Sequence, residues 1–400
     1  MNKLLEYCLA ALLILECNST YIRISSFSGI FSIFTAFIIF ILCIQNVKRK
    51  NNLDYNKIVP FYFFYFLGAL IVFFKSNPEF RISYISKFIM ILPLLILYIA
   101  SYEKGKSRFD LLYKIENLIL IEACISIFFF LFGTLLSIIP STETVYLNWG
   151  EGRYISGWYH LYFEPQFFRN SGIFAEAPMH NYILSIALLT EIYIKRNISK
   201  LKITILTIAI LSTLSTTGQL VLISTLIIQL LTRNKTKRIN VKIKILMYTI
   251  SLGIIIGLYY LLQYILEIKS DTSSYEVRSN YIQIAIKNWQ SSPIFGCGYG
   301  TSILGSSNSI FVLLAEGGLF MFSLYSLSLI YIPLLYWLKK INREYTYFHL
   351  IYWGMFCITI ILYCNITLFL LAIPLASFLK LSTKITETNN TKNIWRKYYQ

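Results

Sequence analysis

Three residues that could do chemistry on a charged substrate lie close together in the segment from Arg169 to Asn181. Arg169, Glu176 and His180 fall within twelve positions, although only 14% of the 400 residues are charged. A guanidinium is planar and permanently charged, and it suits a pair of phosphate oxygens. A carboxylate or an imidazole can take the proton of an attacking hydroxyl near neutral pH. The spacing therefore predicts a catalytic site for a charged substrate.

Each of these residues also has a structural interpretation, and the residues alone leave both open. Arg169 could anchor a helix at the lipid headgroups, and Glu176 could complement the dipole of a helix that starts there. Glu176 and His180 are four residues apart, so they would share a helix face. Glu122 could mark a proton pathway, but the sequence favours its being satisfied near the cytoplasmic edge of the membrane.

The polar stretch that precedes this segment, residues 139–175, is rich in aromatic and charged side chains. Aromatic rings stack on the C–H faces of sugars, while charged groups bind hydroxyls or phosphates. We therefore expect Arg153, Trp158 and His160 to contact the substrate, and His160 could also act as a base. The alternative is an aromatic belt at the membrane interface.

A second polar stretch, residues 265–307, contains Arg278 and a Gly-x-Gly-x-Gly run that ends at Gly300. After Arg278 the apolar residues have helical spacing, which predicts an amphipathic helix on the outer surface. No strand precedes the glycine run, so a nucleotide-binding loop is excluded, and the glycines more simply allow close backbone approach or a hinge.

The next apolar stretch begins near Asn308 and carries an acidic residue, Glu316, about two helical turns further on. An acid inside an apolar helix is energetically expensive, which makes Glu316 a candidate for substrate binding together with Asn308. A helix that starts later would instead leave Glu316 at the membrane interface.

The composition predicts an all-α integral membrane protein, because 56% of the residues are hydrophobic and the polar stretches are too short for a separate soluble core. The net charge of +17 is spread over short loops, where it sets topology and contacts anionic lipid, so a nucleic-acid partner is not expected. The seven cysteines indicate neither a disulfide framework nor a metal cluster, and the first helix is expected to be retained rather than cleaved.

Twelve membrane helices are predicted, near residues 4–22, 27–45, 58–75, 86–100, 115–138, 176–194, 201–214, 219–232, 243–264, 308–338, 346–363 and 366–380. They group into an N-terminal five-helix region, a large extracytoplasmic loop, middle helices, a second extracytoplasmic loop, C-terminal helices and a cytoplasmic tail, at 1–138, 139–175, 176–264, 265–307, 308–380 and 381–400.

The basic residues give the orientation. With both termini inside, 27 of the 36 lysines and arginines lie on the cytoplasmic side. This bias requires 201–214 and 219–232 to be separate helices, because merging them would move a loop with six cations to the outer side. Both long polar stretches then face outward.

Two motifs resemble those of the O-antigen polymerase and ligase superfamily. The first is an R-x-x-G-x-F-x-E-x-P pattern at Arg169, Gly172, Phe174, Glu176 and Pro178. The second is an arginine-to-glycine run that leads to Glu-Gly-Gly, at Arg278, Ala285, Trp289, Pro293, Gly296, Gly298, Gly300 and Glu316. Many relatives have His-Asn at the start of the late helix, where this chain has Ser307-Asn308. That difference disfavours a ligase.

The resemblance implies a Wzy-type polysaccharide polymerase in the inner membrane of a bacterium, acting on undecaprenyl-diphosphate-linked oligosaccharides without a metal or soluble cofactor. It gives Arg169 and Arg278 the diphosphate and Glu176 a supporting role, with Glu176 or His180 as base. A flippase and a chain-length regulator are the partners expected beside the lipid bilayer. The alternatives are a ligase-type transferase of the same superfamily and a lipid-linked oligosaccharide flippase.

Overall fold

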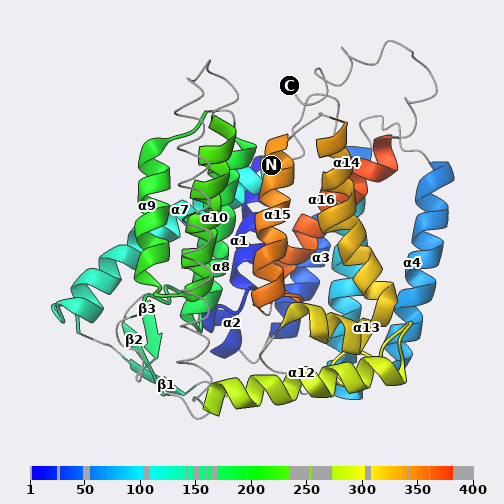
Figure 1. The fold of residues 1–400 in the computed structure, drawn as a ribbon, viewed down its shortest axis with the longest axis horizontal. Helices are drawn as coiled ribbons and strands as arrows, with labels where there is room; N and C mark the ends of the chain where they lie inside the picture. Colours follow the sequence, from blue (N-terminus) through cyan, green and yellow to red (C-terminus); the bar gives the residue numbers. More distant parts are fainter. Residues whose placement is uncertain are drawn as a thin grey trace.

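The computed structural model describes residues 2–24, 28–47, 55–101, 109–140, 143–146, 153–157, 160–163, 169–195, 197–233, 253, 273–301, 308–339, 343–359 and 361–381. The fold of this part is helical, as predicted (Figure 1). In chain order the helices are α1 (Asn2–Leu15), α2 (Thr20–Ile24), α3 (Ser28–Val47), α4 (Tyr55–Lys75), α5 (Arg81–Tyr84), α6 (Leu92–Ala100), α7 (Asp110–Phe129), α8 (Ala177–Leu189), α9 (Lys200–Ser212), α10 (Thr216–Arg233), α12 (Ser273–Ser291), α13 (Ser309–Ser326), α14 (Ile332–Leu338), α15 (Arg343–Ile358) and α16 (Asn365–Leu381).

Short 3-10 or π-helical segments precede or extend several of these helices. They are η1 (Pro78–Phe80), η2 (Ile85–Ile91), η3 (Phe130–Leu135), η5 (Thr190–Ile194) and η6 (Leu327–Tyr331). Through η1 and η2, the helix predicted at 86–100 becomes a longer helical stretch from Pro78 to Ala100.

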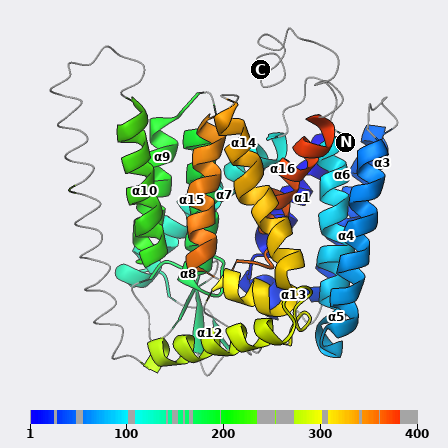
Figure 2. The ribbon, with the colours of Figure 1, turned by 45° about the vertical axis from the view of Figure 1, so that its right-hand side comes forward.

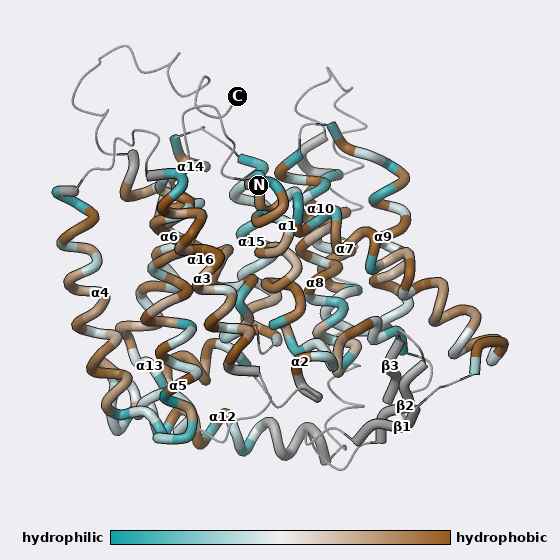
Figure 3. Tube along the Cα trace, turned by 180° about the vertical axis from the view of Figure 1, so that it is seen from behind, coloured by the Kyte–Doolittle hydropathy of each residue, from teal (hydrophilic) through white to brown (hydrophobic). Residues whose placement is uncertain are grey.

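Within the described part of the chain, four helical stretches are long and apolar enough to cross a membrane, namely Asn56–Lys75, Pro78–Ala100, Asp110–Leu135 and Ser309–Leu338. Large apolar side chains on the outside of the bundle, such as Phe63 and Phe64, are more than half exposed. Figure 3 shows α3 and α4 hydrophobic over most of their length. Apolar side chains that face outward along whole helices are typical of a protein surrounded by lipid.

Several predicted helix boundaries differ from the structure. The predicted helix 4–22 ends at Leu15, and a turn through Asn18, whose φ is 62°, leads into α2. The pair predicted at 201–214 and 219–232 is indeed two helices, α9 and α10, separated by a turn at Leu214 with φ 49°. The predicted helix 243–264 and the tail 381–400 lie, but for Gly253 and Leu381, outside the described residues.

The elements divide between two ends of the helical bundle. Helix α12 crosses one end roughly at right angles to the other helices, and β1–β3 lie at the same end (Figures 1 and 2). We call this the outer end, following the predicted topology. Helix α1 starts and α16 finishes at the opposite, inner end. The described part of α12 alternates between hydrophilic and hydrophobic residues, which fits the amphipathic surface helix predicted there (Figure 3).

A three-stranded antiparallel sheet lies at the outer end, where the sequence predicts only a loop. It consists of β1 (Glu143–Tyr146), β2 (Arg153–Gly157) and β3 (His160–Phe163), in the order β1-β2-β3. The strands have only four or five residues and are rich in β-branched and aromatic types, which favour strands. The same residues also suit an aromatic belt or a sugar groove, so composition alone does not separate these structures.

Two helices form the centre of the bundle. All residues of α8 from Met179 to Leu189 are buried, and so are residues 364–377, which include most of α16. Helix α16 packs against α6, and α8 packs against α7, α9 and α10. A helix that is buried all round has no polar face, so hydrophobic periodicity cannot orient it.

The helix predicted at 308–338 is broken at Gly318, whose φ is 59° and ψ is −160°. Figure 1 shows α13 changing direction before it continues into α14. The glycine loop after α12 supplies partners for the break: Cys297 and Gly298 donate to the carbonyls of Ala315 and Glu316 at 2.8 and 2.9 Å. In the reverse direction, Leu319 and Phe320 donate to the carbonyls of Pro293 and Ile294, also at 2.8 and 2.9 Å.

Replacing Gly318 tests this break. A Cβ at Gly318 would overlap the backbone of Ile294 and Gly296, and its φ/ψ region is essentially reserved for glycine. We expect Gly318→Ala to lose about 1–3 kcal/mol or more of unfolding free energy. The matched control is Gly354→Ala in α15, where no atom lies within 4 Å of the added Cβ. The control should gain about 0.5–1 kcal/mol from helix propensity. Thermal unfolding in detergent that gave both variants the same sign of shift would contradict the break.

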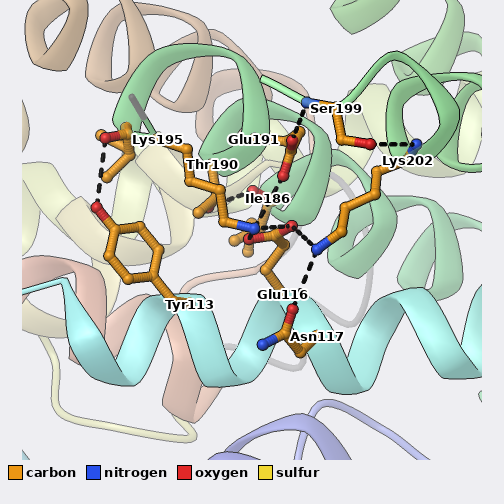
Figure 4. Close-up of polar contacts among 10 residues, drawn as sticks. Tyr113, Glu116, Asn117, Ile186, Thr190, Glu191, Lys195, Ser199 and Lys202 are labelled. Carbon is orange, nitrogen blue, oxygen red and sulfur yellow. Dashed lines mark hydrogen bonds and ion pairs between the residues drawn. The ribbon is translucent and has the colours of Figure 1, made fainter. Parts of the chain in front are cut away.

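A buried ionic cluster connects α7, the segment η5 that follows α8, and α9 (Figure 4). The carboxylates of Glu116 and Glu191 are both fully buried. Lys195 donates to both, at 2.6 Å and 2.9 Å, and Lys202 lies 3.6 Å from Glu116. The backbone N–H of Ser199 donates to the second oxygen of Glu191 at 2.6 Å. Two acids and two lysines leave the cluster with no net charge.

Removal of Lys195 should destabilise the protein strongly. Lys195→Met leaves two buried carboxylates with one lysine, Lys202, which among the described residues pairs only with Glu116. Breaking a buried ion pair on one side costs about 3–5 kcal/mol. Low pH should restore part of this loss, because one carboxylate can then bind a proton. Lys200→Met is the control, because Lys200 is exposed at the start of α9. Equal unfolding midpoints for the two variants in detergent would show that the cluster is not a stabilising element.

Candidate functional site

The first motif begins with an irregular turn, residues 169–176, at the outer end, and the chain becomes helical only at Ala177. We call residues 169–176 the motif turn. Neighbouring turns supply its backbone partners. Thr20 donates to the carbonyl of Ile173, and Ala175 donates to the carbonyl of Asn18, both at 3.0 Å. Because the α1–α2 turn holds one side of the segment and the α9–α10 turn holds the other, its backbone is fixed without being helical.

Arg169 lies at the start of this turn and is half-buried. Its Nε donates to the carbonyl of Thr213, in the α9–α10 turn, at 3.1 Å. Burial lowers the pKa of the Arg169 guanidinium, whereas the Glu176 carboxylate raises it. An arginine remains protonated at physiological pH under such shifts, so the group is a permanent cation with an acid nearby.

Glu176 and His180 do not act as a pair on one helix face, so that prediction is wrong. Glu176 is the extended N-cap residue of α8, with φ −145°, and its side chain is partly exposed. His180 is fully buried, and its ring contacts Glu122, Asn170 and Phe174. The physical reason is that Glu176 is the N-cap: its carbonyl accepts the i, i+4 bond from the N–H of His180 at 3.2 Å, but its extended φ/ψ gives its side chain a different direction from that of a helical residue.

His180 is held by Glu122, which the sequence analysis assigned to the cytoplasmic edge. The Nε2 of His180 lies 2.9 Å from Oε2 of Glu122, and its Nδ1 lies 3.2 Å from the carbonyl oxygen of Asn170. The ring of Phe174 stacks on the imidazole with 5.6 Å between centroids. Glu122 therefore pairs through Oε2 beside the motif turn rather than at the cytoplasmic edge, so the predicted assignment is wrong; its partner is 58 residues away in the sequence.

Asn170 and Gly172 complete the turn. The side chain of Asn170 donates to Ser212 Oγ at 3.0 Å and accepts from the N–H of Gly172 at 3.0 Å. Gly172 has φ +54°, and a Cβ there would collide with the Glu122 carboxylate. Only glycine fits this position, which gives the glycine of the motif a physical reason.

A second centre surrounds Glu316, at the break of α13. The carboxylate is buried and accepts a hydrogen bond from the hydroxyl of Tyr363. A small cavity beside it is lined in part by the rings of Tyr84, Phe88, Tyr299 and Tyr363. The centroids of Tyr299 and Tyr363 are 4.5 Å apart. Carboxylate and aromatic groups together suit a hydroxyl-bearing ligand, and the binding role of Glu316 stays a prediction.

Lys87 belongs to this second centre and was not singled out from the sequence. Its ammonium lies 6.0 Å from the centroid of the Tyr363 ring. Lys87 occurs in the π-helical segment η2, within the candidate span Pro78–Ala100. A cation inside an apolar helix is a functional signal that the sequence already contained. The predicted start of that helix at residue 86 made Lys87 look like an interfacial residue.

Asn308 has a structural role at the start of α13. Its Oδ1 accepts from the N–H of Ile310 at 2.9 Å, and its Nδ2 donates to the carbonyl of Cys357 at 2.6 Å. This is an N-cap, so the predicted helix start is confirmed. The binding role predicted for Asn308 stays a prediction.

The remaining predicted site residues are placed only by their backbone. Arg153 pairs with Tyr146 in the sheet, and His160 pairs with Gly157. Arg278 lies within α12, and Trp158 is outside the described residues. The sheet and α12 lie at the same end as the motif turn (Figure 1). The predicted contacts of these four residues with a substrate, and of Arg278 with the same ligand as Arg169, stay predictions.

No protein-family model, curated protein or solved structure matches the chain. The interpretation of the two centres therefore depends on their residues and geometry. In chemical terms, the first centre offers a permanent cation beside an acid, and the second offers a buried acid among aromatic rings.

The contact between Tyr363 and Glu316 should be energetically coupled. A hydrogen bond to a charged group contributes about 1.5–3 kcal/mol, so Tyr363→Phe should lower the unfolding free energy by about that amount. In a Glu316→Leu background the same substitution should have little effect, because the hydroxyl then has lost its acceptor. A double-mutant cycle from denaturation in detergent measures this coupling. Additive effects of the two substitutions would show that the contact does not form.

Proposed function

We propose that this chain is a membrane glycosyltransferase that polymerises lipid-diphosphate-linked oligosaccharide units into a surface polysaccharide. The observation that carries the proposal is the half-buried guanidinium of Arg169, fixed through Nε to the carbonyl of Thr213 and close to Glu176. A fixed cation at the outer end of an apolar helical bundle suits a diphosphate whose lipid tail lies in the membrane.

In the proposed reaction, a hydroxyl of one lipid-linked unit attacks the anomeric carbon of the growing chain. The new C–O bond forms as the bond from the anomeric carbon to the diphosphate breaks, and the electron pair leaves with the lipid diphosphate. Arg169 and Arg278 stabilise the charge that develops on the leaving group. Glu176 takes the proton of the hydroxyl. Of Glu176 and His180, only Glu176 has a partly exposed side chain.

The proposed substrate has three chemically different parts, and the outer end has groups suited to each. The polyprenyl tail would contact the apolar outer surface of the helices, and the diphosphate would contact the arginines. The sugars would meet Arg153, Trp158 and His160, with Glu316 and Asn308 as further contacts. The free energy for the transfer comes from breaking the bond between the sugar and the lipid diphosphate, so the proposed reaction requires neither a nucleotide sugar nor a metal. The proposed location is the inner membrane of a bacterium.

A lipid-linked oligosaccharide flippase is the second candidate function. It is favoured by one observation, the cation Lys87 within a candidate membrane span next to the buried centre at Glu316. Transport of a charged headgroup needs polar groups at membrane depth. The two functions differ in the product of a deletion strain. Loss of a polymerase leaves single repeat units on the outer face, whereas loss of a flippase leaves them on the inner face.

Replacing Arg169 tests the polymerase proposal. Arg169→Ala should abolish the chain-length ladder of surface polysaccharide in a deletion strain, and Arg169→Lys should restore little, because an ammonium lacks the two-pronged geometry. An arginine that stabilises transition-state charge contributes about a hundredfold or more. Lys339→Ala, an exposed cation at the end of α14, is the matched control. A normal ladder from stably expressed Arg169→Ala would exclude this role, and polymer that stays on the lipid would indicate a ligase.

A further inference from the structure

The protons on His180 can be assigned from its two contacts. The carbonyl oxygen of Asn170, 3.2 Å from Nδ1, can only accept a hydrogen bond, so Nδ1 carries a hydrogen. The contact of 2.9 Å between Nε2 and Glu122 Oε2 then contains a single proton. It lies either on the imidazole, giving an ion pair, or on the carboxyl group, giving a neutral pair.

Both arrangements leave the pair without net charge and with no ring nitrogen of His180 for a substrate. His180 is fully buried, and Phe174 covers one face of its ring. The other oxygen of Glu122, Oε1, is buried against Gly172 and has no hydrogen-bond partner among the residues that the structure describes. An unpartnered buried oxygen is less costly on a neutral carboxyl group than on a carboxylate, so the neutral pair is favoured.

The pair fixes the residue next to Arg169. His180 holds the carbonyl of Asn170, and the N–H and side chain of Asn170 bind the carbonyl and Oγ of Ser212, both at 3.0 Å. The next residue along, Thr213, accepts the hydrogen bond from Arg169 Nε. Asn170 therefore locks the backbone that carries Arg169 to the turn that receives its side chain.

We propose that Glu122 and His180 form a positioning dyad, which shares one proton and holds the Asn170 turn so that the Arg169 guanidinium points in a fixed direction. This inference depends on the proposed function only for the role of Arg169. It assigns His180 a role through Asn170 rather than as the base of the reaction.

The geometry predicts that an amide can replace the acid at position 122. Glu122→Gln can donate its amide hydrogen to Nε2 while Nδ1 still donates to Asn170, so the dyad keeps its shape without an acid. Glu122→Ala cannot. If the proton of the dyad were transferred during the reaction, both variants would fail. If the dyad only positions, the glutamine variant works.

Two measurements on the full chain separate the inference from the proposed function. The first is modification of Arg169 by an arginine-selective dicarbonyl reagent in detergent, followed by mass spectrometry. The second is the polysaccharide ladder in the deletion strain. Glu122→Ala should raise the modification of Arg169 and reduce the ladder about a hundredfold, the size expected when a catalytic group moves by about 1 Å. Glu122→Gln should match the wild type in both.

The control for general destabilisation is Glu6→Ala. Glu6 is a buried acid that pairs with Lys114 at 2.8 Å, on α1 and α7. This variant should lower the unfolding midpoint without changing the reactivity of Arg169. If Glu122→Ala does not accumulate, His180→Asn replaces it, because the asparagine amide can still donate to the Asn170 carbonyl. A ladder from His180→Asn supports positioning.

Three results would decide against the dyad. These are loss of the ladder in stably folded Glu122→Gln, loss in stably folded His180→Asn, or unchanged Arg169 reactivity in folded Glu122→Ala. If Arg169 becomes more reactive in Glu122→Ala but the ladder stays normal, the dyad is supported and the proposed function is excluded.

Discussion

Backbone polar groups that leave a helix inside lipid must find partners within the protein, because the hydrocarbon region offers none. Two segments of this chain leave the helical pattern near the outer end, the turn at 169–176 and the break at Gly318. Each is satisfied by another irregular segment: the first by the α1–α2 and α9–α10 turns, the second by the glycine loop after α12. The irregular segments therefore interlock through mutual backbone hydrogen bonds.

This interlocking explains where the charged and polar groups are found. A regular helix directs its side chains into lipid or into a packed neighbour, whereas a fixed turn can aim one at the membrane surface. Arg169 extends from such a turn, and Glu316 lies two residues before Gly318, the residue at which α13 is broken. Both groups gain a defined position from backbone bonds made by other parts of the chain, which is the kind of preorganisation that a binding site needs.

The features that the sequence predicts correctly are local ones. Hydropathy identifies the helical membrane class, spacing identifies the amphipathic α12, and a capping asparagine marks the start of α13 at Asn308. The balance of basic residues separates α9 from α10. The break at Gly318 was missed because a glycine inside an apolar run is compatible with a straight helix. The hydrogen bonds of the residues after it show that the chain turns there: the N–H groups of Leu319 and Phe320 donate to the carbonyls of Pro293 and Ile294.

The Glu122–His180 contact was missed for a related reason, although depth in the membrane carries a signal. Helices α7 and α8 pack against each other, and in the predicted topology they run in opposite directions. Glu122 is the thirteenth residue of α7, and His180 is the fourth residue of α8. With a rise of about 1.5 Å per residue, both lie about 20 Å from the inner end, because Glu122 is twelve residues after Asp110 and His180 is fourteen residues before Ile194, where η5 ends. An acid in an apolar helix requires a partner at its own depth, and only three histidines are present in the chain. The depths match only because α7 starts at Asp110 rather than at the predicted residue 115, so matching acids to partners by depth requires the helix bounds that the structure gives.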